Sequence, residues 1–336
     1  MKYRPFGKTG WNVSEIGFGA WGIGGSWGPV DDALSIRTLL AAFDRGVNFV
    51  DTAQMYGNGH SEEVIGQALR QWKGDPIYIA TKVQPVVWPR PHELDPSFEG
   101  RYPAAHLREQ CEASLRRLGA ETIDLYQLHG WFPSGVEDTE WYETLSGLKR
   151  EGKIREIGVS IRDYKPHEGI GIARAGLTAS EQVVFNLFEQ RPAADLLPVC
   201  RQHGVGVIAR VPFDEGALVG TWTADTFEQF APDDFRRKYF KGERFARTLE
   251  KVEALKTLVR ELTGDRYASL AEVALRYTLS FPAVSTVIPG IKNLEELDAN
   301  VRVSDGEPLP AELIEALQAH NWPRNYHDPN VGVDPE

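Results

Sequence analysis

The sequence predicts an α/β fold: a (β/α)8 barrel with an N-terminal β-hairpin, a long loop after strand 7, and a C-terminal helix plus tail. Short β-rich runs alternate with amphipathic helical stretches, no low-complexity linker divides the chain, and the count of strands closes at eight. We therefore expect residues 1–336 to form a single barrel domain. An open doubly wound sheet is the alternative, and the count of eight favours the barrel.

The eight expected strands are rich in β-branched and aromatic residues. They cover residues 15–21, 48–53, 77–83, 123–129, 155–160, 181–186, 204–212 and 283–289. Several of the helical stretches between them end in glycine, and Asp31 and Ser61 are expected to be helix N-caps. The hairpin is expected in Met1 to Val13, the long loop in Phe213 to Glu243, and the last helix and tail after Leu309.

Composition and charge exclude several classes of function. The net charge of −11 is unfavourable for a protein whose general partner is a nucleic acid or an anionic membrane. Cys111 and Cys200 belong to no pairing motif, which indicates a reducing compartment. No apolar stretch reaches the roughly eighteen residues of a membrane span, and the N-terminus lacks an apolar signal region. We expect a cytoplasmic protein whose oligomeric state the sequence does not specify.

Four ionisable residues lie at or just after expected strands: Asp51, Tyr56, Lys82 and His129. In a barrel, the C-terminal ends of the strands share one face, so these side chains are expected to converge. A tyrosine hydroxyl has a pKa of about 10, which a nearby ammonium group would lower. Lys82 is expected to supply that ammonium, Asp51 to hold it charged, and His129 to position a carbonyl oxygen. With this support, the Tyr56 hydroxyl would donate a proton to a carbonyl oxygen that gains negative charge.

The segments that carry these residues resemble the aldo-keto reductase superfamily, in a bacterial-type form. The matching segments are "GVNFVDTAQMYGNGHSEEVIGQAL", "IYIATKV", "IDLYQLHG", "GVS" and "VIPG", and the match runs in order from "GKTGWNVSEIGFGAW" to "IPGIKNLEELDAN". The resemblance implies a (β/α)8 barrel that reduces an aldehyde or ketone to an alcohol with NAD(P)H. It also implies that Asp51, Tyr56, Lys82 and His129 form the catalytic tetrad.

The resemblance further implies a set of cofactor contacts. Ser160 and Gln182 would bind the nicotinamide carboxamide, Arg210 would stack on the ring, and backbone amides from Pro212 to Leu218 would cover the pyrophosphate. The remaining implied contacts are Trp21, Gly216, Gly290, Lys292, Glu296 and Asn300. Lys292 suits the 2′-phosphate of NADP(H), which is favoured. NAD(H) stays an alternative, because Asn293 stands where the family often has arginine.

Five aromatic residues are expected in loops at the mouth of the barrel and predict an aromatic-walled pocket for a small carbonyl substrate. They are Trp21, Trp27, Trp88, Trp131 and Phe132. The segment from His320 to His327 is expected to fold over this pocket. The identity of the substrate and the physiological direction of the reaction stay open.

Two other motifs point to different chemistry. "GFGAWG" at residues 17–22 satisfies the spacing of a dinucleotide-binding turn, but no helix opens directly after it, so we interpret it as strand 1 and its loop. His60, Glu62 and Glu63 resemble metal ligands, yet acidic residues are common in a first helical turn. We predict no metal site.

Two rival functions remain. Lys82 at a strand end is also where a Schiff-base aldolase would carry its nucleophile, although a partner at Asp51 would keep this lysine protonated. Some proteins that resemble the family bind the cofactor without significant turnover and act as redox-sensing subunits of a membrane partner.

Overall fold

The computed structural model describes residues 1–25, 28, 30–89, 93 and 96–326. Eight parallel strands form one sheet, and each strand pairs with its neighbours in chain order. They are β3 (Phe18–Gly19), β4 (Phe49–Asp51), β5 (Tyr78–Val83), β6 (Ile123–Trp131), β7 (Ile154–Ile161), β8 (Ser180–Val184), β9 (Gly206–Arg210) and β10 (Val284–Val287). Each expected strand is present, most of them shorter than the sequence predicts.

The first and last strands meet and close the sheet into a barrel. Parallel bridges join Ile16 to Val287 and Gly19 to Gly290, and the Gly19 amide donates to the Pro289 carbonyl at 3.0 Å. A Cβ atom at Gly19 would lie 2.7 Å from two carbonyl oxygens, so only glycine permits this approach. The glycines of "GFGAWG" therefore serve the closure of the barrel and the loop that follows it.

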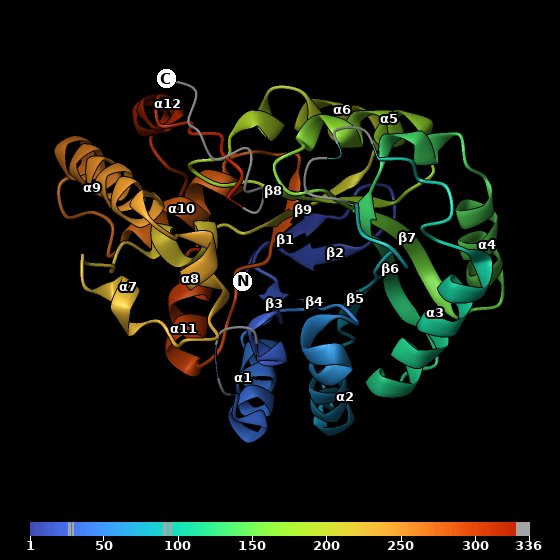
Figure 1. Cartoon of the computed structure of the whole chain (residues 1–336). Coiled ribbons are helices and arrows are strands. Elements are labelled where there is room, and N and C mark those ends of the chain that lie inside the picture. Colours follow the sequence, from blue (N-terminus) through green and yellow to red (C-terminus); the bar gives the residue numbers. More distant parts are fainter. Residues whose placement is uncertain (26–27, 29, 90–92, 94–95, 327–336) are drawn as a thin grey trace.

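Helices surround the strands, as Figure 1 shows. Those that follow β3 to β8 in the chain are α1 (Asp32–Asp44), α2 (His60–Gln71), α3 (Ala104–Leu118), α4 (Glu140–Arg150), α5 (Gly169–Ala175) and α6 (Leu196–His203). After β9 come α7 (Thr226–Gln229), α8 (Phe235–Tyr239), α9 (Glu243–Thr263) and α10 (Leu270–Leu279); α11 (Leu294–Arg302) and α12 (Ala311–Gln318) follow β10. Within the described residues, no helix is both long enough and apolar enough to cross a bilayer.

Short 3-10 helices lie in the connections. They are η1 (Gly22–Gly24), η2 (Tyr56–Gly59), η3 (Pro133–Val136), η4 (Pro166–Glu168), η5 (Arg191–Ala193) and η6 (Asp214–Val219). Five of them follow a barrel strand after at most a few residues, and so help to shape the loops at one end of the barrel.

The expected hairpin is formed by β1 (Tyr3–Pro5) and β2 (Asn12–Ser14). Its turn covers the end of the barrel where the strands begin: Trp11 stacks on Tyr78, the first residue of β5, with ring centroids 4.8 Å apart. Phe6 packs against Phe49 at the start of β4. The hairpin therefore seals the N-terminal end and leaves the opposite end for a site.

Of the two expected N-caps, one is confirmed. The Asp31 carboxylate accepts hydrogen bonds from the amides of Ala33 and Leu34 at the start of α1. The expectation for Ser61 is wrong, because α2 begins one residue earlier, at His60. The Ser61 hydroxyl instead donates to the Ala20 carbonyl at 3.0 Å and ties α2 to the loop after β3.

The long loop after β9 and the C-terminal tail pack together. The Trp322 amide donates to the Phe188 carbonyl at 2.8 Å, and the guanidinium of Arg324 forms a buried ion pair with Asp214 in η6. The tail after α12 is therefore fastened, as far as residue 326, to the loops at the C-terminal end of the barrel.

Candidate active site

A cavity of about 530 Å³ opens at the C-terminal ends of the strands. Every strand from β3 to β10, or the loop that follows it, contributes to its wall, and Asn325 contributes from the tail. Seven described residues that the sequence assigns to the cofactor line this cavity: Trp21, Ser160, Gln182, Arg210, Pro212, Gly216 and Gly290. Trp88, assigned to the substrate pocket, lines it as well.

Three of the four ionisable residues form a direct chain of hydrogen bonds at the base of the cavity. The Lys82 ammonium donates to Asp51 Oδ1 at 2.6 Å, to the Thr52 carbonyl at 2.8 Å and to the Tyr56 hydroxyl at 3.3 Å. Lys82 is fully buried and Asp51 nearly so. Because the Tyr56 oxygen accepts from Lys82, the hydroxyl proton stays available for an acceptor in the cavity.

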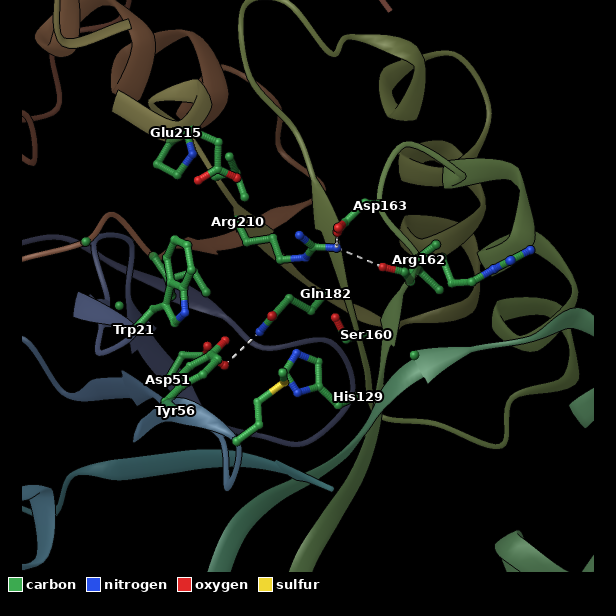
Figure 2. A pocket seen from close by; sticks show the side chains of 18 of the residues that line it. Trp21, Asp51, Tyr56, His129, Ser160, Arg162, Asp163, Gln182, Arg210 and Glu215 are labelled. Atoms are coloured by element: carbon green, nitrogen blue, oxygen red, sulfur yellow. Dashed lines mark hydrogen bonds and ion pairs between the residues drawn. The ribbon is translucent and has the colours of Figure 1, made fainter. Parts of the chain in front are cut away.

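The second carboxylate oxygen of Asp51 is held by two buried amides. Gln182 Nε2 donates to Asp51 Oδ2 at 2.7 Å, and Gln127 Nε2 donates to the same oxygen at 3.3 Å. The first of these bonds is drawn in Figure 2. These contacts lock the carboxylate, and through it they fix the position of the Lys82 ammonium.

The pKa of Tyr56 shifts in the direction opposite to the one expected from the sequence. Burial raises the pKa of Tyr56 above its usual value, and it outweighs the opposing effect of the Lys82 charge. For Lys82, burial acts to lower the pKa, but the Asp51 carboxylate and Tyr56 overcome it, and the net shift is upward. At neutral pH the structure therefore contains a protonated tyrosine beside a charged lysine.

His129 lies across the cavity floor from Tyr56, with ring centroids 5.9 Å apart and an interplanar angle of 81°. The two side chains face the same space in Figure 2. Burial, together with the charges of Lys82 and Arg210, lowers the pKa of His129 well below its usual value. The imidazole is therefore neutral at neutral pH and retains one N–H to donate.

Arg210 crosses the upper part of the cavity and is held from the far side, as Figure 2 shows. Its guanidinium donates to the Ile161 carbonyl at 2.9 Å and to Asp163 Oδ1 at 2.5 Å. Glu215 lines the same wall, and its pKa is raised to about 8 by burial and by the neighbouring carboxylates of Asp214 and Asp163.

Two of the aromatic residues assigned to the pocket lie elsewhere. Trp131 and Phe132 are fully buried and are absent from the described cavity wall. Trp131 packs against Phe98 and Trp141, with ring centroids 5.5 Å apart in both cases. Phe132 lies under the guanidinium of Arg101. Trp27, the fifth, lies outside the described residues.

Four of the residues assigned to the cofactor also lie away from the described cavity wall. Leu218 is buried in the core. Lys292, Glu296 and Asn300 lie at or near α11, whose N-cap Asn293 accepts from the Glu296 amide at 2.9 Å. The Glu296 carboxylate in turn accepts from the Lys292 amide at 2.8 Å. Asn300 is buried, and its Nδ2 has no partner among the residues the structure describes.

No group of three or more His, Cys, Asp or Glu side chains in the described part of the chain has an arrangement that could hold a metal ion. His60 Nε2 instead lies 2.8 Å from Asp32 Oδ1, and Glu62 binds Thr81 and Arg117.

Several residues of the site were not identified from the sequence. Gln127 lies two residues before His129 on β6, so strand alternation could have placed it on the same inward face. Asp163 follows the end of β7 closely, which marks it as a residue of the C-terminal end. Met55, Lys165 and Glu215 also line the cavity, but they lie in loops where no periodic pattern distinguishes an inward side chain.

Comparisons with known proteins agree with this geometry. The family model described as "Aldo/keto reductase family" matches residues 15–321. The NADH-specific methylglyoxal reductase of Escherichia coli is 31% identical over 95% of this chain and 100% of its own length. The glycerol dehydrogenase structure from Gluconobacter oxydans is 30% identical, with a TM-score of 0.74 over 97% of this chain and 96% of that one. An aldo/keto reductase structure from Klebsiella pneumoniae, in complex with NADP and acetate, is 26% identical, with a TM-score of 0.69 over 96% of each chain.

Proposed function

Because this chain belongs to the aldo/keto reductase family, we propose that it reduces an aldehyde or ketone to an alcohol, with Tyr56 as the proton donor. The observation that carries the proposal is the chain Asp51–Lys82–Tyr56 at the base of the cavity, with the hydroxyl proton of Tyr56 unused by any described acceptor. A nicotinamide cofactor, when bound, supplies the hydride to the carbonyl carbon.

The proton is donated from the Tyr56 hydroxyl to the carbonyl oxygen as that oxygen gains negative charge. Lys82 favours this transfer, because its ammonium, 3.3 Å from the hydroxyl oxygen, stabilises the phenolate that forms. Asp51 keeps Lys82 protonated and in place. His129, neutral and across from Tyr56, donates a hydrogen bond that orients the carbonyl oxygen.

The same geometry disfavours a Schiff-base mechanism. A nucleophilic lysine must lose its proton, whereas the pKa of Lys82 is raised by Asp51 and Tyr56 against the effect of burial. Its ammonium already donates three hydrogen bonds, so its donors are saturated.

The residues around the cavity fit a nicotinamide dinucleotide. Ser160 and Gln182 present polar side chains on one wall, and Gln182 has one amide N–H committed to Asp51 while its oxygen can accept. In α11, the buried Nδ2 of Asn300 lacks a partner among the described residues and suits a base or ribose acceptor. We propose that Arg210, and the stretch from Pro212 to Leu218, bind the nicotinamide and pyrophosphate parts.

For the choice between cofactors we keep NADPH as the favoured one, since Lys292 offers a cation for the 2′-phosphate. The Glu296 carboxylate opposes this choice because it lies 2.8 Å from the Lys292 amide, and its negative charge would repel a phosphate there. A Glu296→Gln substitution should therefore tighten NADPH binding several-fold and leave NADH binding nearly unchanged. A titration of each cofactor, followed by tryptophan fluorescence, measures both constants.

The experiment that tests the function combines cofactor binding with turnover. We expect the purified protein to bind NADPH or NADH, with quenching of tryptophan fluorescence, and to consume that cofactor when a small aldehyde is added. Cofactor binding without turnover of any carbonyl in a broad panel would favour a redox-sensing role. Failure to bind either cofactor would contradict the reductase assignment for this chain.

A further inference from the structure

The loop after β7 places a lysine in the wall of the cavity without a partner of opposite charge. Lys165 is half-buried and lines the cavity, and its ammonium forms no ion pair or hydrogen bond with any residue that the structure describes. An ammonium in a cavity wall that has no partner on the protein can bind an anionic ligand through a charge-assisted hydrogen bond.

The other charged side chains of the described wall are already compensated. The pairs are Arg162–Glu168, Arg210–Asp163, Asp51–Lys82 and Glu93–Arg101. Glu215, with a pKa of about 8, is mostly neutral at neutral pH. Lys165 is therefore the one cation, among the described residues of the wall, whose charge is left for a ligand.

The segment that carries Lys165 is held in place. The Lys165 amide donates to the Arg162 carbonyl at 3.2 Å, and the Glu168 amide donates to the Lys165 carbonyl at 3.0 Å. The Arg162 side chain points away from Tyr56 and His129 in Figure 2 and binds Glu168 through two hydrogen bonds. The Tyr164 hydroxyl lies 2.6 Å from that of Tyr239. The lysine thus extends from a fixed backbone, which limits the entropy lost on binding.

The wall also contains an apolar part. Met55 and Trp88 line the cavity from the loops after β4 and β5, and both stay more than two-fifths exposed, with 43% of each accessible. Trp88 packs against the His129 ring, with centroids 6.0 Å apart, so this apolar part adjoins the position assigned to the carbonyl group. A flat apolar body can rest there while a charged substituent is bound elsewhere on the wall.

We propose that the preferred substrates are carbonyl compounds with an apolar body and a carboxylate, and that Lys165 binds the carboxylate. This inference rests on the proposed reductase function and adds the substrate class. One ammonium matches one carboxylate charge, and a charge-assisted hydrogen bond from Lys165 would discriminate against a neutral ester of the same shape.

The test compares para-carboxybenzaldehyde with its methyl ester, methyl para-formylbenzoate. The readout is the ratio of kcat/KM for the acid to that for the ester, so differences in intrinsic reactivity cancel between variants. We expect Lys165→Gln to lower this ratio roughly tenfold and Lys165→Arg to retain it. The control is Lys149→Gln, which removes the same charge from a lysine of α4 that pairs with Glu156 of β7 outside the cavity wall, and it should leave the ratio unchanged.

An unchanged ratio in Lys165→Gln would overturn the proposal while leaving the reductase function intact. If cofactor binding is then also weaker, measured by fluorescence titration, Lys165 is a cofactor residue; if cofactor binding is unchanged, Lys165 binds neither ligand. If the wild-type protein reduces neither aldehyde nor any other carbonyl, the proposed function fails, and this inference fails with it.

Discussion

Burial and charge act in opposite directions on the residues at the base of the cavity. For Tyr56 burial dominates, and the pKa rises despite the ammonium 3.3 Å away. For Lys82 the carboxylate of Asp51 dominates, and the pKa also rises. Both groups therefore keep their protons at neutral pH, which suits a site that donates a proton during carbonyl reduction.

The raised pKa of Glu215 leads to a prediction about cofactor binding. The group lies within the stretch from Pro212 to Leu218, for which we propose a pyrophosphate contact, and it becomes an anion above about pH 8. We expect the cofactor Kd to rise roughly tenfold from about pH 7 to about pH 9, because like charges then oppose each other. Fluorescence titrations across this range measure the effect.

In the Glu215→Gln variant, cofactor binding should not weaken between about pH 7 and about pH 9. The matched control is Glu228→Gln, a change at a carboxylate of the same loop that stands 78% exposed. Equal pH dependence in wild type and Glu215→Gln would assign the titration to another group.

At the scale of elements, the position of Tyr56 depends on two turns that touch. Gly57 has φ of 60°, and a Cβ atom at Gly24 in η1 would lie 2.7 Å from the backbone of Tyr56 and Gly57. The loops after β3 and β4 therefore approach at a distance that only glycine allows. Because Tyr56 begins η2, this contact determines where its hydroxyl lies relative to Lys82.

We predict that Gly24→Ala shifts Tyr56 and lowers kcat/KM for carbonyl reduction at least tenfold, since small displacements of a reacting group are costly. The thermal midpoint should fall only slightly, because the change lies in a surface loop. Gly171→Ala in α5 is the control, as its added Cβ meets nothing closer than 3.6 Å. Unchanged activity in Gly24→Ala would show that the two turns can separate without consequence.

A second prediction at this scale concerns Glu181, which lies on β8 against the start of α5. Both of its carboxyl oxygens are buried and lack a partner among the described residues. Burial raises the pKa of this group well above its usual value. The folded protein therefore retains a proton that the unfolded chain releases near pH 4, and stability falls as the pH rises above about 4.

Replacing Glu181 by Gln removes this titration. We expect the variant to have the higher free energy of unfolding at about pH 8, by about 1 kcal/mol or more, and a weaker pH dependence than wild type. Urea unfolding at several pH values measures both, with the exposed Glu121→Gln as the control. If the free energy of unfolding of the wild type rises with pH in parallel with that of Glu181→Gln, the carboxyl group of Glu181 is not neutral in the folded protein.

At the scale of the whole molecule, the barrel brings distant segments together at one end. Asp51, Lys82, His129 and Gln182 come from four strands, and the tail returns to the same end to place Asn325 in the wall. The tail is fastened there by Arg324, whose guanidinium lies over three aromatic rings and pairs with Asp214.

We predict that Arg324→Met destabilises the protein by about 3–5 kcal/mol, because it leaves the Asp214 carboxylate buried without its counter-charge. Lys256→Met, which removes an exposed pair with Glu253, should cost at most about 1 kcal/mol. Chemical denaturation measures both changes. Equal, small losses would indicate that the tail contributes little to stability.

The convergence of the four ionisable residues was predictable because each lies at or just after a strand, and strand ends share a face in a barrel. The error at Trp131 has a local cause. From the sequence, this strand is expected to end at residue 129 and Trp131 to lie in a loop, whereas β6 continues to Trp131, with a shift of its register against β7 after His129. The raised pKa of Tyr56 was not predictable either, since burial depends on how all the loops pack over the site.

The most direct test of the account is the pH dependence of kcat/KM for carbonyl reduction in wild type, Tyr56→Phe and Tyr78→Phe. Tyr78 begins the same strand that carries Lys82 but lies at the opposite end of the barrel. With saturating cofactor, we predict that kcat/KM of the wild type declines at strongly alkaline pH as Tyr56 loses its proton. Tyr56→Phe should lack this decline and lose about a hundredfold or more in kcat/KM, while it still binds cofactor. A Tyr56→Phe enzyme with wild-type rate and pH profile would contradict the proposed proton donor.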